Sequence, residues 1–515
     1  MVDGSSRLLE LLGGLSLASD VVNAFPLGKT VRTALLASDL ARAIGEPVDV
    51  AGDALYLTIL RYLGCTGFAH VEAHVYGAGD DHSVRTTMVL ADVADPVATV
   101  ARIARGVAPA ASALRRAAAI GRLLGDGVAG HAHAQAQCET SAILARQIGA
   151  SARIVDALSQ ICERWDGKGE PARIEGEAIA IAIRVYSVAD IVEVVHHREG
   201  REAAIDTARR RSGAHFEPRI AAALASEAAR LFDRIESADV LEHFLAAEPA
   251  PHTMIDRARA LDVARALGRF VDLKSVYTLG HAEGVASLAR AIAAAMGASA
   301  ETTVDVELAG HLHDLGRVSV PNAIWDHPGP LGFAERERVR LHAYYTDRIL
   351  TPCRAVGRAA AVAAAAHERL DGRGYHRGVG ASALAPAARI LAVADAMHAM
   401  REPRPHRPTR SEAEIATSLR DGARSGALDV DVVDAALALA GGGRRAPART
   451  GLSDRELEIV RWVARGKTNK EIGIILGISP RTVQTHVARV YAKVGVYSRA
   501  GAALYAMENA LLESS

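Results

Sequence analysis

Histidine and aspartate residues recur between residues 270 and 440, in segments whose apolar residues repeat with helical spacing. The densest group contains His313 and Asp314, whose side chains point about 100° apart on a helix. These two side chains can meet at one metal ion only if other helices supply further ligands. The residues that could do so are His281, His342, His367 and Asp395. Imidazole and carboxylate ligands suit Fe, Mn or Zn, and the absence of cysteine from the set argues against a structural zinc site. The set therefore predicts a divalent metal site.

The last sixty-odd residues carry the start signals of three short helices. Ser453–Glu456 and Thr468–Glu471 have the Ser/Thr-x-x-Glu pattern of a capping box, which begins a helix. Ser479 before a proline predicts a third start, and the third helix should span about Pro480–Val494. A glycine ends each of the first two helices. Two short helices and a tight turn before a third helix have the spacing of a helix-turn-helix.

The third of these helices has two different faces. One stripe contains Val483, Val487, Val490 and Val494, which we assign to the core. The opposite face contains Arg481, Thr485, Ala488, Arg489 and Ala492, flanked by Gln484 and Lys493. Arginines, small residues and an amide without an acidic residue suit the major groove of double-stranded DNA. The alternative is an ordinary solvent-exposed face of a small helical domain.

The composition supports a helical protein whose basic surface is local. The chain has 515 residues and a formal net charge of zero, so any nucleic-acid binding must be confined to one region. Half of the residues are hydrophobic but only 4% are aromatic, and alanine is abundant. This mixture favours an all-α fold in which helices pack through small side chains.

Cysteine usage and apolar runs predict a cytoplasmic protein. The four cysteines, Cys65, Cys138, Cys162 and Cys353, are scattered without metal-binding spacing, as expected for reduced thiols. The longest apolar runs, near Ala178–Ile183 and Ala359–Ala366, are far shorter than the roughly 18–20 residues of a membrane span. The N-terminus has no apolar signal core. We therefore expect no membrane association.

The first 440 residues contain an internal duplication. Glu163–Gly169 matches Glu368–Gly374, and Ala182–Asp190 matches Ala387–Asp395, both at an interval of 205 residues. The Gly/Pro-rich segment 441–450 should be a flexible linker, and a weaker boundary lies near the prolines at 249 and 251. We therefore expect a first copy at 1–250, a second copy at 251–440, the linker at 441–450 and a C-terminal domain at 451–515.

The first copy lacks the predicted metal ligands. Lys29 stands where His281 does, and Gly64-Cys65 is aligned with His313-Asp314. The remaining counterparts of the ligand set are Gln137, Cys162 and Asp190. Lysine and glutamine in place of histidine offer no ligand suited to a divalent metal, and Asp190 alone cannot hold one. We expect the first copy to hold no metal and to pack against the second copy or sense a ligand.

The C-terminal domain resembles the LuxR-type DNA-binding domain over nearly all of Leu452–Leu511. The resemblance lies in Leu452–Glu458, Gly466–Ile472 and Leu476–Val487. It implies that the third helix is the recognition helix and that a fourth helix, starting at Ser498, supports a homodimer on DNA. By the same resemblance Lys470 and Thr482 contact phosphates, Gln484, Thr485 and Ala488 face bases, and Arg489 and Lys493 lie at or near the DNA backbone. Many relatives have lysine at 484 and 488, so this face is less basic than in those relatives.

The second copy resembles the HD-GYP subclass of the HD phosphohydrolase superfamily over about 170 residues. The matching segments are Gly280-His281, His313–Pro321, Pro328–Leu331, His342, His367-Glu368, Asp371–Tyr375, Arg389–Asp395 and Arg404-Pro405. The resemblance implies that His281, His313, Asp314, His342, His367 and Asp395 are metal ligands, and that Asp314 and Arg317 are catalytic. The family uses its metal cluster to hydrolyse cyclic di-GMP or a related phosphodiester. The expected fold is thus all-α, with two tandem HD-type domains before a four-helix LuxR-type domain.

The second copy departs from the family pattern at four positions. Ala366 replaces the first of two consecutive histidines, and Tyr277 stands where three-metal members have a glutamate. We therefore expect one metal ion or at most two. Arg317 replaces a lysine; it can hold a phosphate but is not a point charge. The proline of the Gly-Tyr-Pro signature is His376.

Two functions from different classes follow. In the first, the chain is a transcription regulator whose DNA binding is controlled by an HD-GYP-like domain that senses or hydrolyses a cyclic dinucleotide. In the second, it is primarily a metal-dependent phosphodiesterase that its DNA-binding domain localises or represses. The nearly intact DNA-binding motif favours the first, because the metal site has lost a ligand at Ala366.

Overall fold

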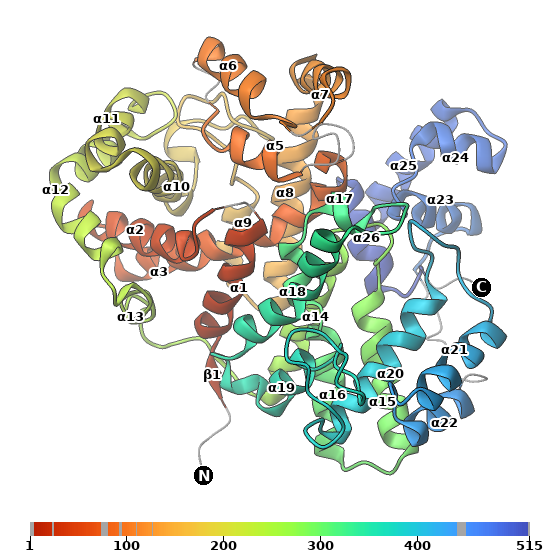
Figure 1. The fold of residues 1–515 in the computed structure, drawn as a ribbon. Coiled ribbons are helices and arrows are strands. Elements are labelled where there is room, and N and C mark those ends of the chain that lie inside the picture. The colour runs from red at the N-terminus through yellow and green to blue at the C-terminus, as the bar shows by residue number, and fades with distance from the viewer. Residues whose placement is uncertain are drawn as a thin grey trace. The chain divides into compact units, whose positions relative to one another are not determined.

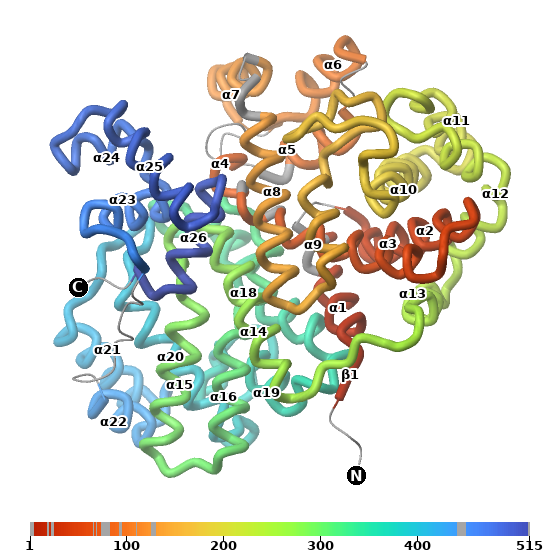
Figure 2. The backbone as a smooth tube through the Cα atoms, turned by 180° about the vertical axis from the view of Figure 1, so that it is seen from behind, coloured from red at the N-terminus to blue at the C-terminus, as the bar shows by residue number. Residues whose placement is uncertain are grey.

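The computed structural model describes residues 5–22, 25–73, 81–91, 95–109, 111–125, 127–439 and 450–512. Nearly all of its regular structure is helical, which confirms the predicted all-α class (Figures 1 and 2). The exceptions are two-residue strands that pair with each other, β1 (Ser6–Arg7) and β2 (Met254–Ile255). The predicted linker, 441–450, lies almost entirely outside the described residues. No helix of the described ranges is both long enough and apolar enough to cross a membrane.

The chain divides into two compact units. The first-copy unit spans Arg7–Met254, and the second unit contains Met1–Ser6 and Ile255–Ser515. The helices of the first-copy unit are α1 (Leu8–Val22), α2 (Lys29–Ala43), α3 (Val48–Leu60), α4 (Ala69–Val71), α5 (Asp81–Met88), α6 (Pro96–Gly106), α7 (Ala113–Gly125), α8 (Gly127–Ile148), α9 (Ala152–Leu158), α10 (Ile181–Glu199), α11 (Arg201–Arg211), α12 (Pro218–Glu236) and α13 (Val240–Ala246), with 3₁₀ helices at Arg61–Phe68 and Gly176–Ala178.

The second unit repeats this pattern and adds the C-terminal domain. Its first helices are α14 (Arg257–Asp272), α15 (His281–Ala295), α16 (Ala300–Leu312), α17 (Asn322–Trp325), α18 (Phe333–Leu350), α19 (Arg358–Ala364), α20 (Pro386–Arg401), α21 (Glu412–Arg424) and α22 (Val430–Ala438), with 3₁₀ helices at Leu315–Ser319 and Arg354–Val356. Helix α15 packs against both α16 and α20 (Figure 2). Small residues allow this close approach, since a Cβ atom on Gly310 would lie 2.5 Å from the Cα of Ala286.

The C-terminal domain has the four predicted helices, α23 (Asp454–Ala464), α24 (Asn469–Leu476), α25 (Pro480–Val494) and α26 (Arg499–Glu508). Both predicted capping boxes are present, at Ser453 and at Thr468. The Ser479 hydroxyl accepts a hydrogen bond from the Thr482 amide and so caps α25, as expected. Val483 and Val490 are buried while Val487 and Val494 are half-buried, so the valine stripe faces the core.

The second helix begins in the same way in both copies. Gly28 and Gly280 both adopt a left-handed conformation, with φ of 84° and 85°, immediately before α2 and α15. The residue that follows is Lys29 in the first copy and His281 in the second, as the alignment predicted. Each side chain is almost fully buried at the first position of its helix.

One part of the sequence alignment between the copies is wrong by three residues. Thr346 donates its hydroxyl to the carbonyl of His313 at 3.0 Å, and Ser141 makes the same bond to Arg61 at 2.9 Å. The residues that occupy the positions of His313 and Asp314 are therefore Arg61 and Tyr62, and not Gly64-Cys65. Gly64 instead corresponds to Gly316. The register is fixed by these two helix–helix hydrogen bonds, which the sequence alone does not reveal.

The centre of the first-copy unit is a buried cation–carboxylate cluster. The Lys29 ammonium contacts the Asp190 carboxylate directly and donates to the Tyr62 hydroxyl at 2.7 Å. Arg61 lies 3.9 Å from the second Asp190 oxygen, to which Tyr186 also donates at 3.0 Å. Despite its burial, the pKa of Asp190 is held below its ordinary value by Lys29 and Arg61. Two protein cations thus neutralise the carboxylate that corresponds to Asp395.

We expect Lys29→Met to destabilise the first-copy unit by about 3–5 kcal/mol, because the buried Asp190 loses the cation in direct contact with it and keeps only Arg61 at 3.9 Å and the Tyr186 hydrogen bond. Hydrogen exchange of α2 and α10 in the full chain measures this as a lower opening free energy. In the wild type, the lowered pKa of Asp190 keeps its contribution complete above about pH 4. In the variant, burial raises the pKa of Asp190, so this carboxyl takes up a proton more easily. The difference in opening free energy between wild type and variant should therefore shrink as the pH falls from 8 to 5.

The matched control is Arg153→Met, which removes an exposed guanidinium that pairs with Asp49 and Asp53 at the surface of the same unit. Exposed pairs contribute little, so protection of α2 and α10 should stay at the wild-type level. Equal protection in the Lys29 variant and the control would contradict a stabilising role for the buried cluster.

Candidate metal centre and DNA-binding face

All six predicted ligands converge on one buried cluster, although they come from five separate segments. His281 is the first residue of α15, and His313 with Asp314 directly follow α16. His342 lies in α18, His367 follows α19, and Asp395 lies in α20. Spacing in the sequence could not prove this convergence, since it depends on how α15, α16 and α20 pack.

One group of ligand atoms surrounds a first possible metal position. The Nε2 atom of His281 lies 3.2 Å from Asp395 Oδ1 and 3.7 Å from Asp314 Oδ2. The Nε2 atom of His313 lies 3.7 Å from each of the same two oxygens. Atoms from His281, His313 and Asp395 all lie within 4.8 Å of one another, a spacing that one ion could span.

A second group of ligand atoms faces the other oxygen of Asp314. The Oδ1 atom of Asp314 lies 3.2 Å from His342 Nε2 and 3.5 Å from His367 Nε2. The second ring nitrogen of His367 lies 3.4 Å from Asp395 Oδ2. Asp314 therefore presents one oxygen to His281 and His313 and the other to His342 and His367.

The histidine rings are oriented with their Nε2 atoms toward the cluster. His313 donates Nδ1–H to the carbonyl of Gly310 at 2.8 Å, and His342 donates Nδ1–H to the carbonyl of Val339. In each ring the Nε2 lone pair is left as the ligand atom. The Nε2 atoms of His313, His342 and His367 are buried without a hydrogen-bond partner. Buried acceptors of this kind are costly unless they coordinate an ion, so the donor set fits a divalent metal.

The charges in the cluster reinforce this fit. Although burial alone would raise them, the pKa values of Asp314 and Asp395 are held well below the ordinary range, chiefly by the neighbouring histidines. Burial opposes a charge on His281, but Glu402 and Asp395 raise its pKa to about 10. Both carboxylates are thus anionic at neutral pH, as metal binding requires, and His281 must release a proton to coordinate an ion.

Arg317 lies at the edge of the cluster and is held from two sides. Its guanidinium donates to Asp314 Oδ2 at 2.8 Å and stacks on the ring of Trp325 at 4.0 Å. Trp325 also donates its indole N–H to the Arg317 carbonyl at 3.2 Å. No pattern in the sequence pointed to Trp325. The ring of Tyr375, from the segment after the predicted ligand His367, stacks on that histidine at 4.9 Å.

Two further residues contact the cluster and were missed from the sequence. The carboxylate of Glu402 lies 3.0 Å from His281 Nδ1, and the ring of His398 lies between Glu402 and α15. A signal for both was present in the sequence. Asp395, His398 and Glu402 have the three- and four-residue spacing that places side chains on one helical face.

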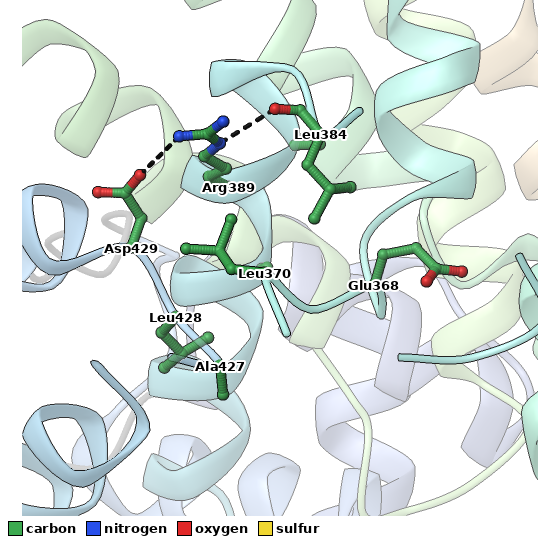
Figure 3. A pocket seen from close by; sticks show the side chains of 9 residues that line it. Glu368, Leu370, Leu384, Arg389, Ala427, Leu428 and Asp429 are labelled. Carbon is green, nitrogen blue, oxygen red and sulfur yellow. Dashed lines mark hydrogen bonds and ion pairs between the residues drawn. The ribbon is translucent and has the colours of Figure 1, made fainter. Parts of the chain in front are cut away.

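A small pocket in the same unit lies apart from the ligand atoms. Figure 3 shows Glu368, Leu370, Leu384 and Arg389 among its lining residues, where Arg389 is fixed by Asp429 at 3.1 Å and by the Leu384 carbonyl at 3.0 Å. Most of the lining is aliphatic, and Leu384 belongs to a small hydrophobic cluster. None of the six predicted ligands lines this pocket, which is a packing feature behind the site.

The predicted DNA-binding residues lie on the exposed face of α25 and near the start of α24. Exposed side chains there are Lys470, Arg481, Thr482, Gln484, Thr485, Ala488, Arg489 and Lys493. Lys493 differs from the rest, because its ammonium forms an ion pair with Glu456 at 2.7 Å. The geometry gives Lys493 a role in joining α25 to α23, in addition to its predicted place beside the DNA backbone.

Comparison with known proteins matches two regions of the chain to family models. Residues 265–432 match the family described as HD domain, and residues 450–506 match bacterial regulatory proteins of the luxR family. The chain is 33% identical over 276 residues to a 3′3′-cGAMP-specific phosphodiesterase 3 from Vibrio cholerae, which covers 53% of this chain and 60% of that relative. It is 40% identical over 106 residues to the transcriptional regulatory protein LiaR of Bacillus subtilis, covering 20% of this chain and 50% of LiaR.

The fold also has a solved counterpart. The crystal structure of a cyclic GMP-AMP-specific phosphodiesterase of V. cholerae, V-cGAP3, matches 85% of this chain and 99% of its own, with a TM-score of 0.59 and 24% identity. That level of identity supports the fold alone. The chain covers less than two thirds of the length of these curated relatives. What the comparisons establish is that the chain combines an HD domain at residues 265–432 with a luxR-family DNA-binding domain at residues 450–506.

Proposed function

We propose that this protein is a LuxR-type transcription regulator whose HD domain binds a cyclic dinucleotide at a divalent metal centre and thereby controls binding to double-stranded DNA. The observation that carries the proposal is the placement of two groups of imidazole nitrogens on the two oxygens of Asp314. The proposed domains are 1–250, 251–440 and 451–515, and the linker 441–450 joins the second domain to the third.

The metal centre would have two positions that share Asp314. The first would be held by His281, His313, Asp314 and Asp395, and the second by His342, His367 and Asp314. Because Ala366 supplies no ligand, the second position has fewer protein ligands and should bind its ion more weakly. The ligands suit Fe, Mn or Zn. When bound, such an ion polarises a phosphoryl oxygen and lowers the pKa of water.

The side chains around the centre suit a phosphodiester. Arg317 has five N–H donors and gives one to Asp314, so others are available for a phosphate oxygen. Stacking on Trp325 fixes the plane of the guanidinium, which reduces the entropy lost when a phosphate binds. The relatives are named for 3′3′-cGAMP and cyclic di-GMP, so a cyclic dinucleotide is the ligand class that we propose.

Hydrolysis of that ligand is the second candidate function. It is favoured by the six predicted ligands and Arg317, which lie together around the two carboxylates. In this case the luxR-family domain would localise a phosphodiesterase on DNA. The two candidates share the metal centre and differ in whether the nucleotide is cleaved.

The DNA-binding half of the proposal rests on α25. Its exposed face combines Arg481 and Arg489 with Gln484, Thr485 and Ala488, so charge and hydrogen-bonding groups lie side by side. We propose that Gln484 and Thr485 contact base edges, while Lys470, Thr482 and Arg489 contact phosphates. With few lysines on this face, two copies of the chain on paired half-sites would supply the affinity that one copy lacks.

We expect the purified full chain to contain stoichiometric Fe, Mn or Zn by elemental analysis, and turnover of a cyclic dinucleotide, measured in parallel, distinguishes the two candidate functions. His313→Ala should lower both the metal content and any turnover, because it removes a ligand of the first position. His131→Ala, on a half-exposed residue of the first-copy unit, is the control and should change neither. Bound metal without turnover would support a sensor, and the absence of bound metal would contradict the metal centre.

A substitution on α25 tests the DNA-binding face. Thr485→Glu should weaken binding to a DNA operator at least about tenfold in a gel-shift titration, since it places a carboxylate among phosphates and base acceptors. Thr417→Glu is a matched control, because Thr417 is also exposed and donates its hydroxyl to the carbonyl four residues earlier, as Thr485 does. Unchanged binding by the Thr485 variant would exclude α25 as the recognition helix.

Control of DNA binding by the nucleotide is tested by measuring operator affinity with and without a saturating cyclic dinucleotide. Coupling between two sites in one protein commonly amounts to about 1–3 kcal/mol, a change of about 5–150-fold in affinity. We expect a change in this range in the wild type and none in His313→Ala. If neither cyclic di-GMP nor 3′3′-cGAMP changes the operator affinity, regulation of DNA binding by the nucleotide is contradicted. The phosphodiesterase function then remains as the candidate.

A further inference from the structure

We propose that Glu402 is the residue that positions His281 as a metal ligand, with His398 and Gly284 fixing Glu402 and Arg404 holding it against α15. This inference rests on the proposed metal centre and extends it to a layer of residues behind the ligands. None of these four residues belongs to the six-ligand set.

His281 needs this support because of where it lies in its helix. His313 and His342 donate Nδ1–H to the backbone carbonyl three residues earlier. His281 is the first residue of α15, and the carbonyl three residues before it, that of Thr278, accepts the backbone N–H of His281 instead, at 3.0 Å. The Nδ1 atom of His281 does not bond to this carbonyl and lies beside the Glu402 carboxylate instead. A side chain from elsewhere must accept Nδ1–H if Nε2 is to face the cluster.

Glu402 is in the right place to do this. Its Oε2 atom lies 3.0 Å from His281 Nδ1, while His281 Nε2 lies 3.2 Å from Asp395 on the other side of the ring. The ring is only 1% exposed, so water does not compete for Nδ1. A carboxylate that accepts Nδ1–H fixes the tautomer, holds the ring plane and makes Nε2 a stronger donor to a metal.

The carboxylate of Glu402 is itself fixed from two directions. Arg404 donates to its Oε2 atom at 2.7 Å and also donates to the Tyr277 carbonyl at 3.3 Å, which joins the residues after α20 to the segment before α15. The other oxygen, Oε1, lies 3.4 Å from His398 Nδ1. Oε2 is therefore held by two hydrogen bonds and Oε1 has His398 as a neighbour, so rotation of the carboxylate would break its contacts with His281 and Arg404.

Gly284 makes room for His398. A Cβ atom on Gly284 would lie 1.8 Å from the Nε2 atom of His398 and 2.4 Å from its Cε1 atom, far inside contact distance. Gly284 is three residues after His281 on α15, so His398 fills the space beside the ligand that a larger residue would occupy. The two positions are thus coupled, and a larger residue at 284 would displace His398 and the contact it makes with Glu402.

The same three side chains could by spacing alone hold an ion of their own, since ligand atoms of His281, His398 and Glu402 lie within 4.8 Å of one another. Two observations favour positioning instead. His281 would have to use both ring nitrogens as ligands and so lose its last proton, which is costly for imidazole. The guanidinium of Arg404, 2.7 Å from Glu402, would also repel a cation at that point.

The experiment measures metal affinity in the full-length chain by competition with a chelator, using Zn²⁺, and records the visible spectrum of the Co²⁺-loaded protein. Glu402→Ala should weaken the tighter binding step about 10–100-fold, the range typical of partners behind a metal-ligating histidine. Glu402→Gln keeps an acceptor for Nδ1–H and should recover part of that loss. Gly284→Ala should also weaken binding, although residue 284 offers no ligand atom. The Co²⁺ spectrum should change in the Ala variants.

The control is Glu412→Gln, which alters an exposed glutamate paired with Arg401 in the same unit and should leave affinity and spectrum unchanged. Thermal unfolding of the metal-free proteins separates positioning from folding, since a positioning role predicts equal midpoints for Glu402→Gln and wild type. Wild-type affinity and spectrum in Glu402→Ala would overturn the inference while the metal centre stands. Loss of one whole equivalent of ion in His398→Ala would overturn it too, by showing that the triad holds its own ion. A wild type that binds no metal would overturn both proposals.

Discussion

The central constraint of this fold is a carboxylate that is buried where four or five helical segments meet and must be neutralised there. In the second unit that residue is Asp395 on α20, and in the first-copy unit it is Asp190 on α10. A buried charge without a partner costs several kcal/mol, so each copy needs a cation at this point. The first copy places Lys29 and Arg61 beside Asp190, whereas the second places histidines beside Asp395. One copy therefore supplies its cation from its own side chains, and the other has a donor set that fits a divalent metal ion.

This constraint explains what could be predicted from the sequence. The six candidate ligands were identifiable because His and Asp at these positions, in this order, resemble a known family. The capping boxes at Ser453 and Thr468 and the valine stripe of α25 follow from local rules of helix formation, and the structure contains all of them. Local signals and motif order were sufficient for the helical class, for the C-terminal domain and for the choice of ligand candidates.

Two features could not be predicted from the sequence: the register between packed helices, and the residues that contact and orient the side chains of the cluster. The position of Arg61 depends on its contact with Ser141, eighty residues away, and no local pattern records that contact. Trp325 was also missed, because its contribution is a stacking contact with Arg317 that no local pattern records. Glu402 was missed because a single glutamate after a helix is usually a surface residue. Its role becomes visible only when α20 brings it to the start of α15.

The residues around the histidine–aspartate cluster of the second copy also bear on whether this cluster is decaying or adapted. Decay of a site should leave isolated substitutions, because nothing maintains compensation between neighbours. Arg317 stands where the family has lysine, and the indole of Trp325 stacks on its guanidinium. The candidate ligand His281 contacts the Glu402 carboxylate, which Arg404 holds. Gly284 leaves space beside them for His398. In the first copy, by contrast, every ligand position except Asp190 has been replaced, and a lysine fills the centre. The two copies therefore neutralise the same buried carboxylate in different ways, and the coupled contacts in the second copy are those expected if the proposed metal centre is maintained.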